Sequence, residues 1–157
     1  MTIIVYSSKT GSSERYARAL SESTGFAAFS VKDDYDHEQS IVFIGWIRGI
    51  ALVGFDKVDR SKVIAVAAVA LDDKPKNGWN RIKDLNEIKV PFYHLPGWID
   101  RKKIGPVNKL LFCLLCVYYK LQGLDSHTKP LFDAMMNGGS FYDESRLEPL
   151  ILFCKSH

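Results

Sequence analysis

Cysteine, net charge and long apolar runs are all scarce in this sequence, and each shortage excludes a class of protein. The three cysteines in 157 residues, Cys113, Cys116 and Cys154, are typical of a reduced cytoplasmic protein rather than of a disulfide scaffold. The net charge of +3 is too small to predict nucleic-acid binding, and no block of Lys and Arg resembles a nucleic-acid arm. The longest apolar run, residues 110–119, is about half the ~20 residues of a spanning helix.

The remaining composition is that of an ordinary globular protein. Hydrophobic residues make up 46% of the chain and charged residues 25%. Met1 leads directly into apolar residues without a basic leader, so we expect no signal peptide and a cytoplasmic location. A chain of this length is expected to form one domain, residues 1–157, with a core that needs no disulfide or structural metal.

Apolar, β-branched stretches alternate with helical ones along the chain. We expect strands at residues 2–6, 26–31, 41–44, 62–71 and 88–94. We expect helices at residues 13–23, 79–85, 106–121, 128–137 and 145–154, the last beginning with a capping box formed by residues 145–148. Residues 47–57 stay undecided, because Gly49 and Gly54 weaken a helix. This alternation predicts a parallel sheet with helices on both faces, and ligands bind such sheets at the carboxyl ends of the strands.

The loop after the first expected strand is rich in hydroxyl groups. It reads Ser8, Lys9, Thr10, Gly11, Ser12, Ser13 and opens a helix, so backbone N–H groups, a helix dipole and hydroxyls come together as a phosphate monoester requires. It lacks the three spaced glycines of a dinucleotide site and the Gly-Lys-Ser/Thr of a triphosphate loop. Lys9 either adds charge or points to solvent. The alternative is a serine-rich helix cap that binds no ligand.

A strand followed by [Ser/Thr]-x-Thr-Gly-x-[Ser/Thr] and a helix resembles the flavodoxin family, and residues 8–13 fit that pattern at every position. The resemblance implies that this loop holds the phosphate of FMN without a metal. It also implies a three-layer, doubly wound α/β sandwich with a five-stranded parallel sheet in the order 2-1-3-4-5.

Two further segments follow the third and fifth expected strands, where the flavin ring is expected. Trp46, Ile47, Arg48 and Gly49 follow Gly45, and the family resemblance implies that a residue here flanks the ring. Trp46 supplies a flat apolar surface, although packing as a core residue is an equal alternative, and Arg48 is either a ligand contact or a surface charge. The other segment is Leu95, Pro96, Gly97 and Trp98, in which Pro96 and Gly97 predict a turn. The nearby His94 either tunes the reduced flavin or shuttles a proton, or is a strand-end residue without chemistry, and we favour the last.

The segment after Gly97 is similar to a branch of flavodoxin-domain proteins that includes menaquinone-dependent protoporphyrinogen oxidase. That branch carries a mostly helical insertion after the fifth strand, which here corresponds to roughly residues 99–140. The expected helix 106–121 is apolar nearly all round, so it must be buried, dimerised or in contact with lipid. Arg101, Lys102 and Lys103 precede it and favour an anionic surface, or they form a solvated turn. We interpret Cys113 and Cys116 as apolar residues, because they lie inside the helix and lack a second pair for zinc.

Together these patterns predict an FMN-binding redox protein. The resemblance points to an oxidoreductase of the protoporphyrinogen-oxidising type that passes electrons to a quinone or similar acceptor. The alternatives are an electron carrier between protein partners and a non-redox module that binds another phosphate ester. Flavodoxin carriers are usually acidic, so the mildly basic composition favours the enzyme. No residue is predicted as a catalytic acid, base or nucleophile, and no metal is expected.

Overall fold

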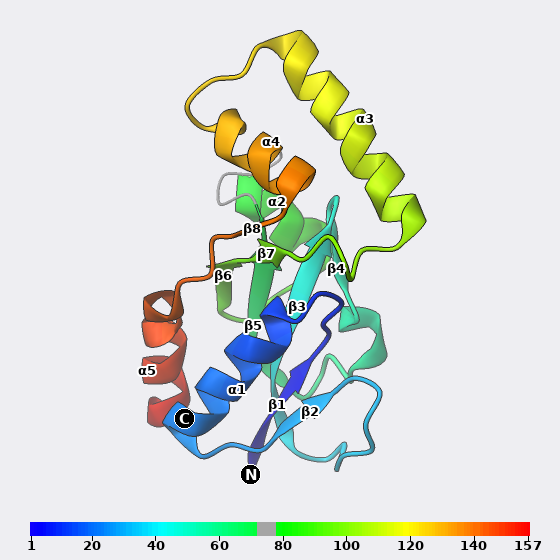
Figure 1. Ribbon diagram of the computed structural model, residues 1–157. Helices are drawn as coiled ribbons and strands as arrows, with labels where there is room; N and C mark the ends of the chain where they lie inside the picture. The colour runs from blue at the N-terminus through cyan, green and yellow to red at the C-terminus, as the bar shows by residue number, and fades with distance from the viewer. Residues whose placement is uncertain (72–77) are drawn as a thin grey trace.

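A mostly parallel β-sheet with helices on both faces forms the body of the protein (Figure 1). The computed structural model describes residues 1–71 and 78–157. The main strands are β1 (Thr2–Tyr6), β2 (Ala28–Ser30), β3 (Ser40–Arg48), β5 (Val63–Ala70) and β6 (Phe92–Pro96). They are parallel to their neighbours in the order β2-β1-β3-β5-β6, and β4 (Ala51–Val53) pairs antiparallel with β3.

Each face of the sheet is covered by its own set of elements. Helices α1 (Ser12–Thr24) and α5 (Glu148–Ser156) pack on one face, where Tyr16, Leu20 and Leu150 are buried against strand residues such as Val42 and Ala67. The other face is covered by α2 (Gly78–Leu85), a 3-10 turn (Phe55–Lys57) and the loops beside them. Strand β5, sequence VIAVAAVA, is buried on both faces, as its continuous apolar run requires.

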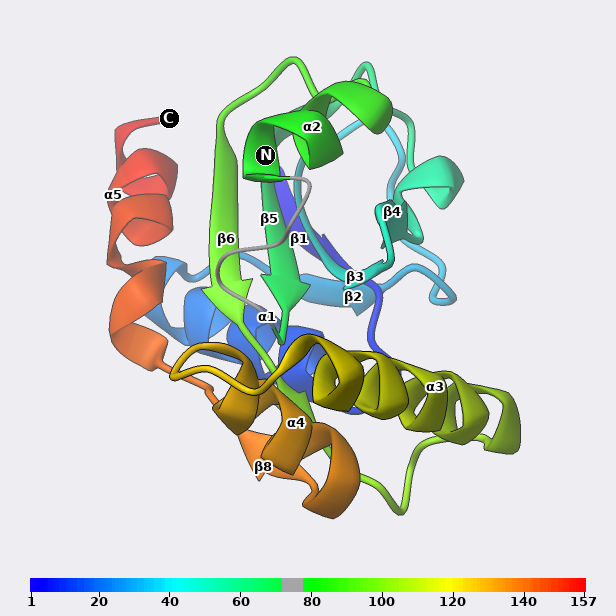
Figure 2. The ribbon, with the colours of Figure 1, turned by 90° about the horizontal axis from the view of Figure 1, so that it is seen from above.

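The segment between β6 and α5 forms a small layer above the carboxyl edge of the sheet (Figures 1 and 2). It contains α3 (Pro106–Gln122) and α4 (Thr128–Asn137). Strand β7 (Trp98–Ile99) pairs antiparallel with β8 (Gly139–Ser140), which joins the two ends of the segment. A core of its own, built on Ile99, Ile104, Cys116, Leu131 and Met135, holds this layer together.

The prediction that the third strand ends before Gly45 is wrong, because β3 continues to Arg48 and turns back into β4. Residues 46–48 are therefore the end of a strand rather than a loop. A Cβ at position 45 would lie 2.9 Å from Leu52 Cδ1 and 3.0 Å from the Val53 carbonyl oxygen. The close approach of β4 therefore explains why a glycine stands at this position of the strand. The propensity of glycine predicts a turn here. The strand continues instead because residues 46–48 pair with β4.

Two other expected boundaries also move. Strand β6 begins at Phe92 rather than Ile88, because Ile88 leaves the sheet plane to pack in the core between the sheet and α2. The predicted capping box at residues 145–148 is wrong. Asp143 accepts hydrogen bonds from the N–H and hydroxyl of Ser145 and caps a 3-10 turn (Glu144–Leu147), after which α5 begins.

Candidate functional site

A cavity of about 340 Å³ lies at the carboxyl edge of the sheet. Its walls come from five separate segments of the chain: the loop before α1, the β3–β4 hairpin, the end of β5, the β6–β7 turn and α3. The lining includes Lys9, Thr10, Ser12, Trp46, Ile47, Arg48, Gly49, Val69, Ala70, Leu71, Gly97, Trp98 and Ile99. Nine of the fourteen residues expected at a cofactor site therefore surround one cavity, of a size that small-molecule pockets commonly have.

The loop before α1 presents an open helix N-terminus. Gly11 precedes the helix with a φ of 101°, a conformation that favours glycine, and its N–H donates to the Ser8 hydroxyl at 3.1 Å. Within the described part of the chain, no side chain caps the first turn of α1 by a hydrogen bond. The Ser13 hydroxyl is fully buried beside it and has no hydrogen-bond partner among the described residues. Unpaired amide and hydroxyl donors are what an anion requires.

Trp98 links this loop to the β6–β7 turn. Its indole N–H donates to the Thr10 carbonyl at 2.9 Å, and the Thr10 hydroxyl lies 3.5 Å from the Trp98 carbonyl, to which it donates. A Cβ at Gly11 would lie 3.3 Å from Trp98 Cζ2 and 4.0 Å from Lys103 Nζ. The absence of a side chain at Gly11 therefore lets the tryptophan ring approach the loop, with a positive charge nearby. The guanidinium of Arg15 lies 5.7 Å from the centre of the Trp98 ring.

Trp46 lies both at the edge of the core and in the cavity wall. It is half-buried, packs against the core beneath α1 and also lines the cavity. Arg48, at the end of β3, is exposed and lines the same cavity. Gly49 adopts a φ of 67° in the turn that follows. The hairpin thus brings one aromatic surface and one cation to the cavity.

The remaining expected residues lie elsewhere. Ser8 and Gly11 in the loop, and Ser13 in the first turn of α1, are adjacent in sequence to the lining residues Lys9, Thr10 and Ser12 but do not line the cavity themselves. Leu95 is 1% exposed in the core under α1. The Pro96 carbonyl accepts a hydrogen bond from the Tyr16 hydroxyl at 2.7 Å. The structure therefore does not bring Leu95 and Pro96 to this cavity, because they complete strand β6 before the chain turns.

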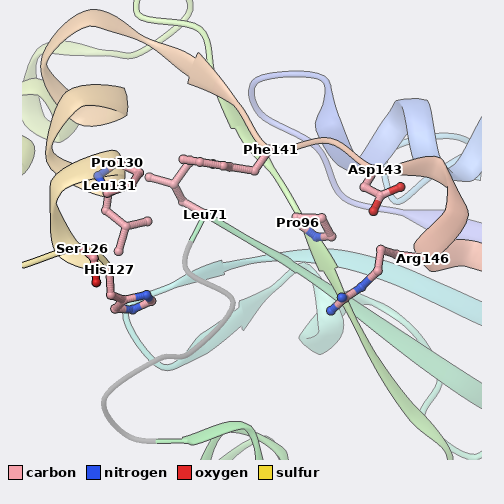
Figure 3. Close-up of a pocket in the computed structure, with 9 residues that line it drawn as sticks. All are labelled: Leu71, Pro96, Ser126, His127, Pro130, Leu131, Phe141, Asp143 and Arg146. Atoms are coloured by element: carbon pink, nitrogen blue, oxygen red, sulfur yellow. The ribbon is translucent and has the colours of Figure 1, made fainter.

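A second cavity, of about 310 Å³, lies on the other side of the β6 end (Figure 3). Ser126, His127, Pro130 and Leu131, in and just before α4, lie on one side of it and Asp143 and Arg146 on the other, with Leu71 and Phe141 between them. It includes no residue of the loop before α1. Next to this cavity, the Tyr16 hydroxyl donates to the Pro96 carbonyl and accepts a hydrogen bond from the Asp143 N–H at 3.0 Å. Burial raises the pKa of Tyr16 to about 12, so this phenol stays protonated as a structural group.

Sequence reasoning missed the wall that α3 contributes. Asn108, Leu111, Phe112 and Leu115 face the cavity. Their spacing of three to four residues places them along one side of a helix, which is the signal that the sequence offered. Which neighbour this side meets depends on how the helix folds back over the sheet. The cavity is therefore largely apolar above the loop.

The other chemically notable side chains lie outside the cavity lining. His94 stacks on Trp79 of α2, with ring centres 4.9 Å apart, on the opposite face of the sheet from α1. Cys116 and Cys154 are buried, and desolvation raises the pKa of both thiols, that of Cys154 to about 11. Neither thiol has the lowered pKa of a reactive cysteine.

A scan against models of protein families found no match to this chain, and a search among curated proteins found no relative.

Proposed function

We propose that the chain is a flavodoxin-like redox protein that binds FMN in the cavity at the carboxyl edge of its sheet. One observation carries this proposal: the hydroxyl-rich loop opens into the same cavity as the two tryptophan-bearing segments. A phosphate monoester and a flat aromatic ring need these two surfaces side by side. The sheet order β2-β1-β3-β5-β6 supports a flavodoxin-like fold when β4 is counted as an addition to β3.

The residues present fit the phosphate of FMN. Thr10 and Ser12 line the cavity, and the buried Ser13 hydroxyl is a donor without a partner among the described residues. The uncapped first turn of α1 adds backbone N–H groups and the positive end of the helix dipole. Lys9 lines the cavity and Lys103 approaches the loop, so positive charge surrounds the phosphate position. These donors need no metal to balance a dianion.

The apolar part of the cavity fits the flavin ring. Trp46 and Trp98 supply aromatic surface, and Gly49 and Gly97 let the backbone approach the ring edge. When bound, FMN supplies one- or two-electron redox chemistry. The protein's own contribution is to hold and orient the ring, to exclude water through Leu111, Phe112 and Leu115, and to provide the charge of Arg48 near the ring edge.

The apolar α3 wall favours an oxidoreductase over an electron carrier. A carrier presents its flavin edge to a protein partner, whereas here Leu111 and Leu115 cover the same edge of the sheet with side chains suited to a small apolar acceptor. We therefore propose that the acceptor is a quinone or a similar small molecule. Stopped-flow mixing of the reduced protein with a menaquinone analogue tests this against a ferredoxin or a cytochrome. Failure of the quinone to reoxidise the protein would rule out the quinone-linked form.

FMN binding itself is tested by titration of the purified protein, followed by flavin fluorescence and thermal unfolding. We expect quenched fluorescence and a raised unfolding temperature, and weaker effects with riboflavin, which lacks the phosphate. Ser13→Ala is expected to weaken FMN binding about tenfold or more while leaving riboflavin binding unchanged, since hydrogen bonds to charged groups contribute about 1.5–3 kcal/mol. The fold should tolerate this change because the Ser13 hydroxyl makes no hydrogen bond within the described residues.

The matched control is Ser23→Ala, an exposed serine on the same helix. It is expected to bind FMN like the unaltered protein. The proposal is contradicted if saturating FMN produces no fluorescence quenching and no thermal shift. If Ser13→Ala binds FMN as tightly as the unaltered protein does, and riboflavin binds as tightly as FMN, then the phosphate lies outside this loop.

A further inference from the structure

The side of α3 that faces away from the rest of the protein is apolar and exposed. Figures 1 and 2 show this helix at the outer edge of the molecule, with α4 next to it on one side. Phe112, Cys116 and Tyr119 point inward, toward the small core of the insertion. We call the opposite side the outer face; it consists of Val107 (72% exposed), Leu110 (63%), Leu114 (60%), Val117 (56%) and Leu121 (81%).

The exposed apolar surface is wider than a helix-pairing seam. Leu111, Leu115 and Tyr118 are also exposed beside the outer face. At 3.6 residues per turn, the exposed apolar positions cover an arc of about 160°. A two-helix coiled coil buries two positions in seven, so pairing with one more helix would leave part of this surface in water. A bilayer boundary accepts the whole arc at once.

The charged side chains of α3 and of the turn before it are all basic, although Asp100 and Asp125 lie at the two ends of this segment. Residues 101–124 contain five basic residues and no acidic residue, although the whole chain has a net charge of only +3, so the remainder of the chain is net negative. Lys102, Lys109 and Lys120 are exposed beside the apolar surface. A symmetric dimer through this face would set the same positive groups against each other. Anionic lipid headgroups complement them instead, and lysine side chains reach headgroups from an apolar surface.

The length of α3 excludes a spanning arrangement for this helix. Its 17 residues extend about 26 Å, less than the ~30 Å hydrocarbon core. No helix in residues 1–71 or 78–157 is long and apolar enough to cross a membrane. A helix with a wide apolar arc and flanking lysines lies instead in the plane of the membrane interface.

We propose that the outer face of α3, with its flanking basic residues, docks on the surface of an anionic lipid bilayer. This surface is separate from the FMN site and does not require FMN. It adjoins the cavity, because Leu111 and Leu115 belong both to the exposed apolar arc and to the cavity wall. Docking would therefore bring the cavity close to the bilayer.

Co-sedimentation with vesicles tests the proposal, using the full chain with and without added FMN. We expect binding to an equimolar mixture of phosphatidylcholine and phosphatidylglycerol, weaker binding to phosphatidylcholine alone, and the same result with or without FMN. The double change Leu114→Gln and Leu121→Gln is expected to weaken binding at least about tenfold, because each leucine loses the transfer of its side chain from water. The matched control is Leu85→Gln with Leu152→Gln, which are 53% and 62% exposed on α2 and α5.

The charge contribution is tested separately. Lys102→Gln with Lys109→Gln should weaken binding to the anionic vesicles about fivefold per charge and leave binding to phosphatidylcholine unchanged. Lys57→Gln with Lys155→Gln removes two exposed charges elsewhere and is expected to have little effect.

Three results would overturn the proposal. The first is that the unaltered protein stays in the supernatant with anionic vesicles. The second is that the outer-face variant sediments like the control variant. The third is a stable dimer, measured by light scattering, that the outer-face variant dissociates while neutral and anionic vesicles bind equally; this face would then pair with a second copy. Circular dichroism of each variant verifies that it is folded. FMN titration of the same preparations separates failure of this proposal from failure of the FMN proposal.

Discussion

The hydroxyl of Tyr16 joins α1 to the end of β6 and to the 3-10 turn that precedes α5. The change Tyr16→Phe removes this hydroxyl and nothing else. The hydroxyl donates to the Pro96 carbonyl at 2.7 Å and accepts the Asp143 N–H at 3.0 Å, and the side chain is fully buried. Phenylalanine keeps the ring and its packing but leaves the part-buried Pro96 carbonyl and Asp143 N–H without this partner. We expect a loss of about 2 kcal/mol in the free energy of unfolding near pH 8. For a chain of this size that corresponds to about 4–8 °C in the unfolding temperature.

The pH dependence makes this prediction specific. The pKa of Tyr16 is about 12 in the folded protein, because burial disfavours the phenolate, against 10.0 for an ordinary tyrosine. Its stabilising contribution is complete below pH 10 and is lost as the pH rises toward 12, because the unfolded chain releases the proton first. By pH 11 the unaltered protein loses about 1.4 kcal/mol through this group, and Tyr16→Phe loses none. The difference between the two proteins should therefore shrink from about 2 to below about 1 kcal/mol.

Urea unfolding at pH 8 and pH 11, followed by circular dichroism, measures both effects. The titration of Cys154, whose pKa is raised to about 11 by desolvation, affects both proteins equally and cancels in the difference. Tyr142→Phe is the matched control at pH 8, since its hydroxyl donates to the exposed Glu144 carboxylate. That change should cost less than about 0.5 kcal/mol. Equal stability of Tyr16→Phe and the unaltered protein at pH 8, or a constant difference from pH 8 to pH 11, would refute this account of the hydroxyl.

Two further predictions concern a close contact and the thiols. Gly54→Ala places a Cβ 2.5 Å from the Ser7 Cβ at a φ of 88°, whereas Gly49→Ala at a φ of 67° meets nothing within 4 Å. By urea unfolding, we expect the first to cost more than about 2 kcal/mol and the second about 1 kcal/mol, and equal costs would contradict the contact. A thiol reagent at neutral pH is expected to modify the exposed Cys113 quickly and the buried Cys116 and Cys154 only after unfolding. Rapid modification of all three would show that both α3 and α5 open readily.

Much of the candidate site was predictable because its signals are local. The loop at residues 8–13 follows a strand and opens a helix, and both features are legible in neighbouring residues. The convergence of this loop with Trp46 and Trp98 follows from parallel strands, whose carboxyl ends share one edge of the sheet. Of the five expected residues that do not line the cavity, Leu95 and Pro96 lie at a strand end, where sequence signals locate boundaries least accurately.

The sequence by itself determined the strands and helices with strong periodicity. Residues 63–70 form a strand because a continuous β-branched and alanine run can be buried on both faces, and residues 106–122 form a helix with Pro106 at its start. Only the tertiary structure decided that β3 continues into a hairpin, because the partner strand β4 supplies its hydrogen bonds. It also decided which side of α3 covers the cavity and which stays exposed. A helix that is apolar nearly all round has no broad polar face to fix its orientation, so packing against α4 and the sheet edge decides it.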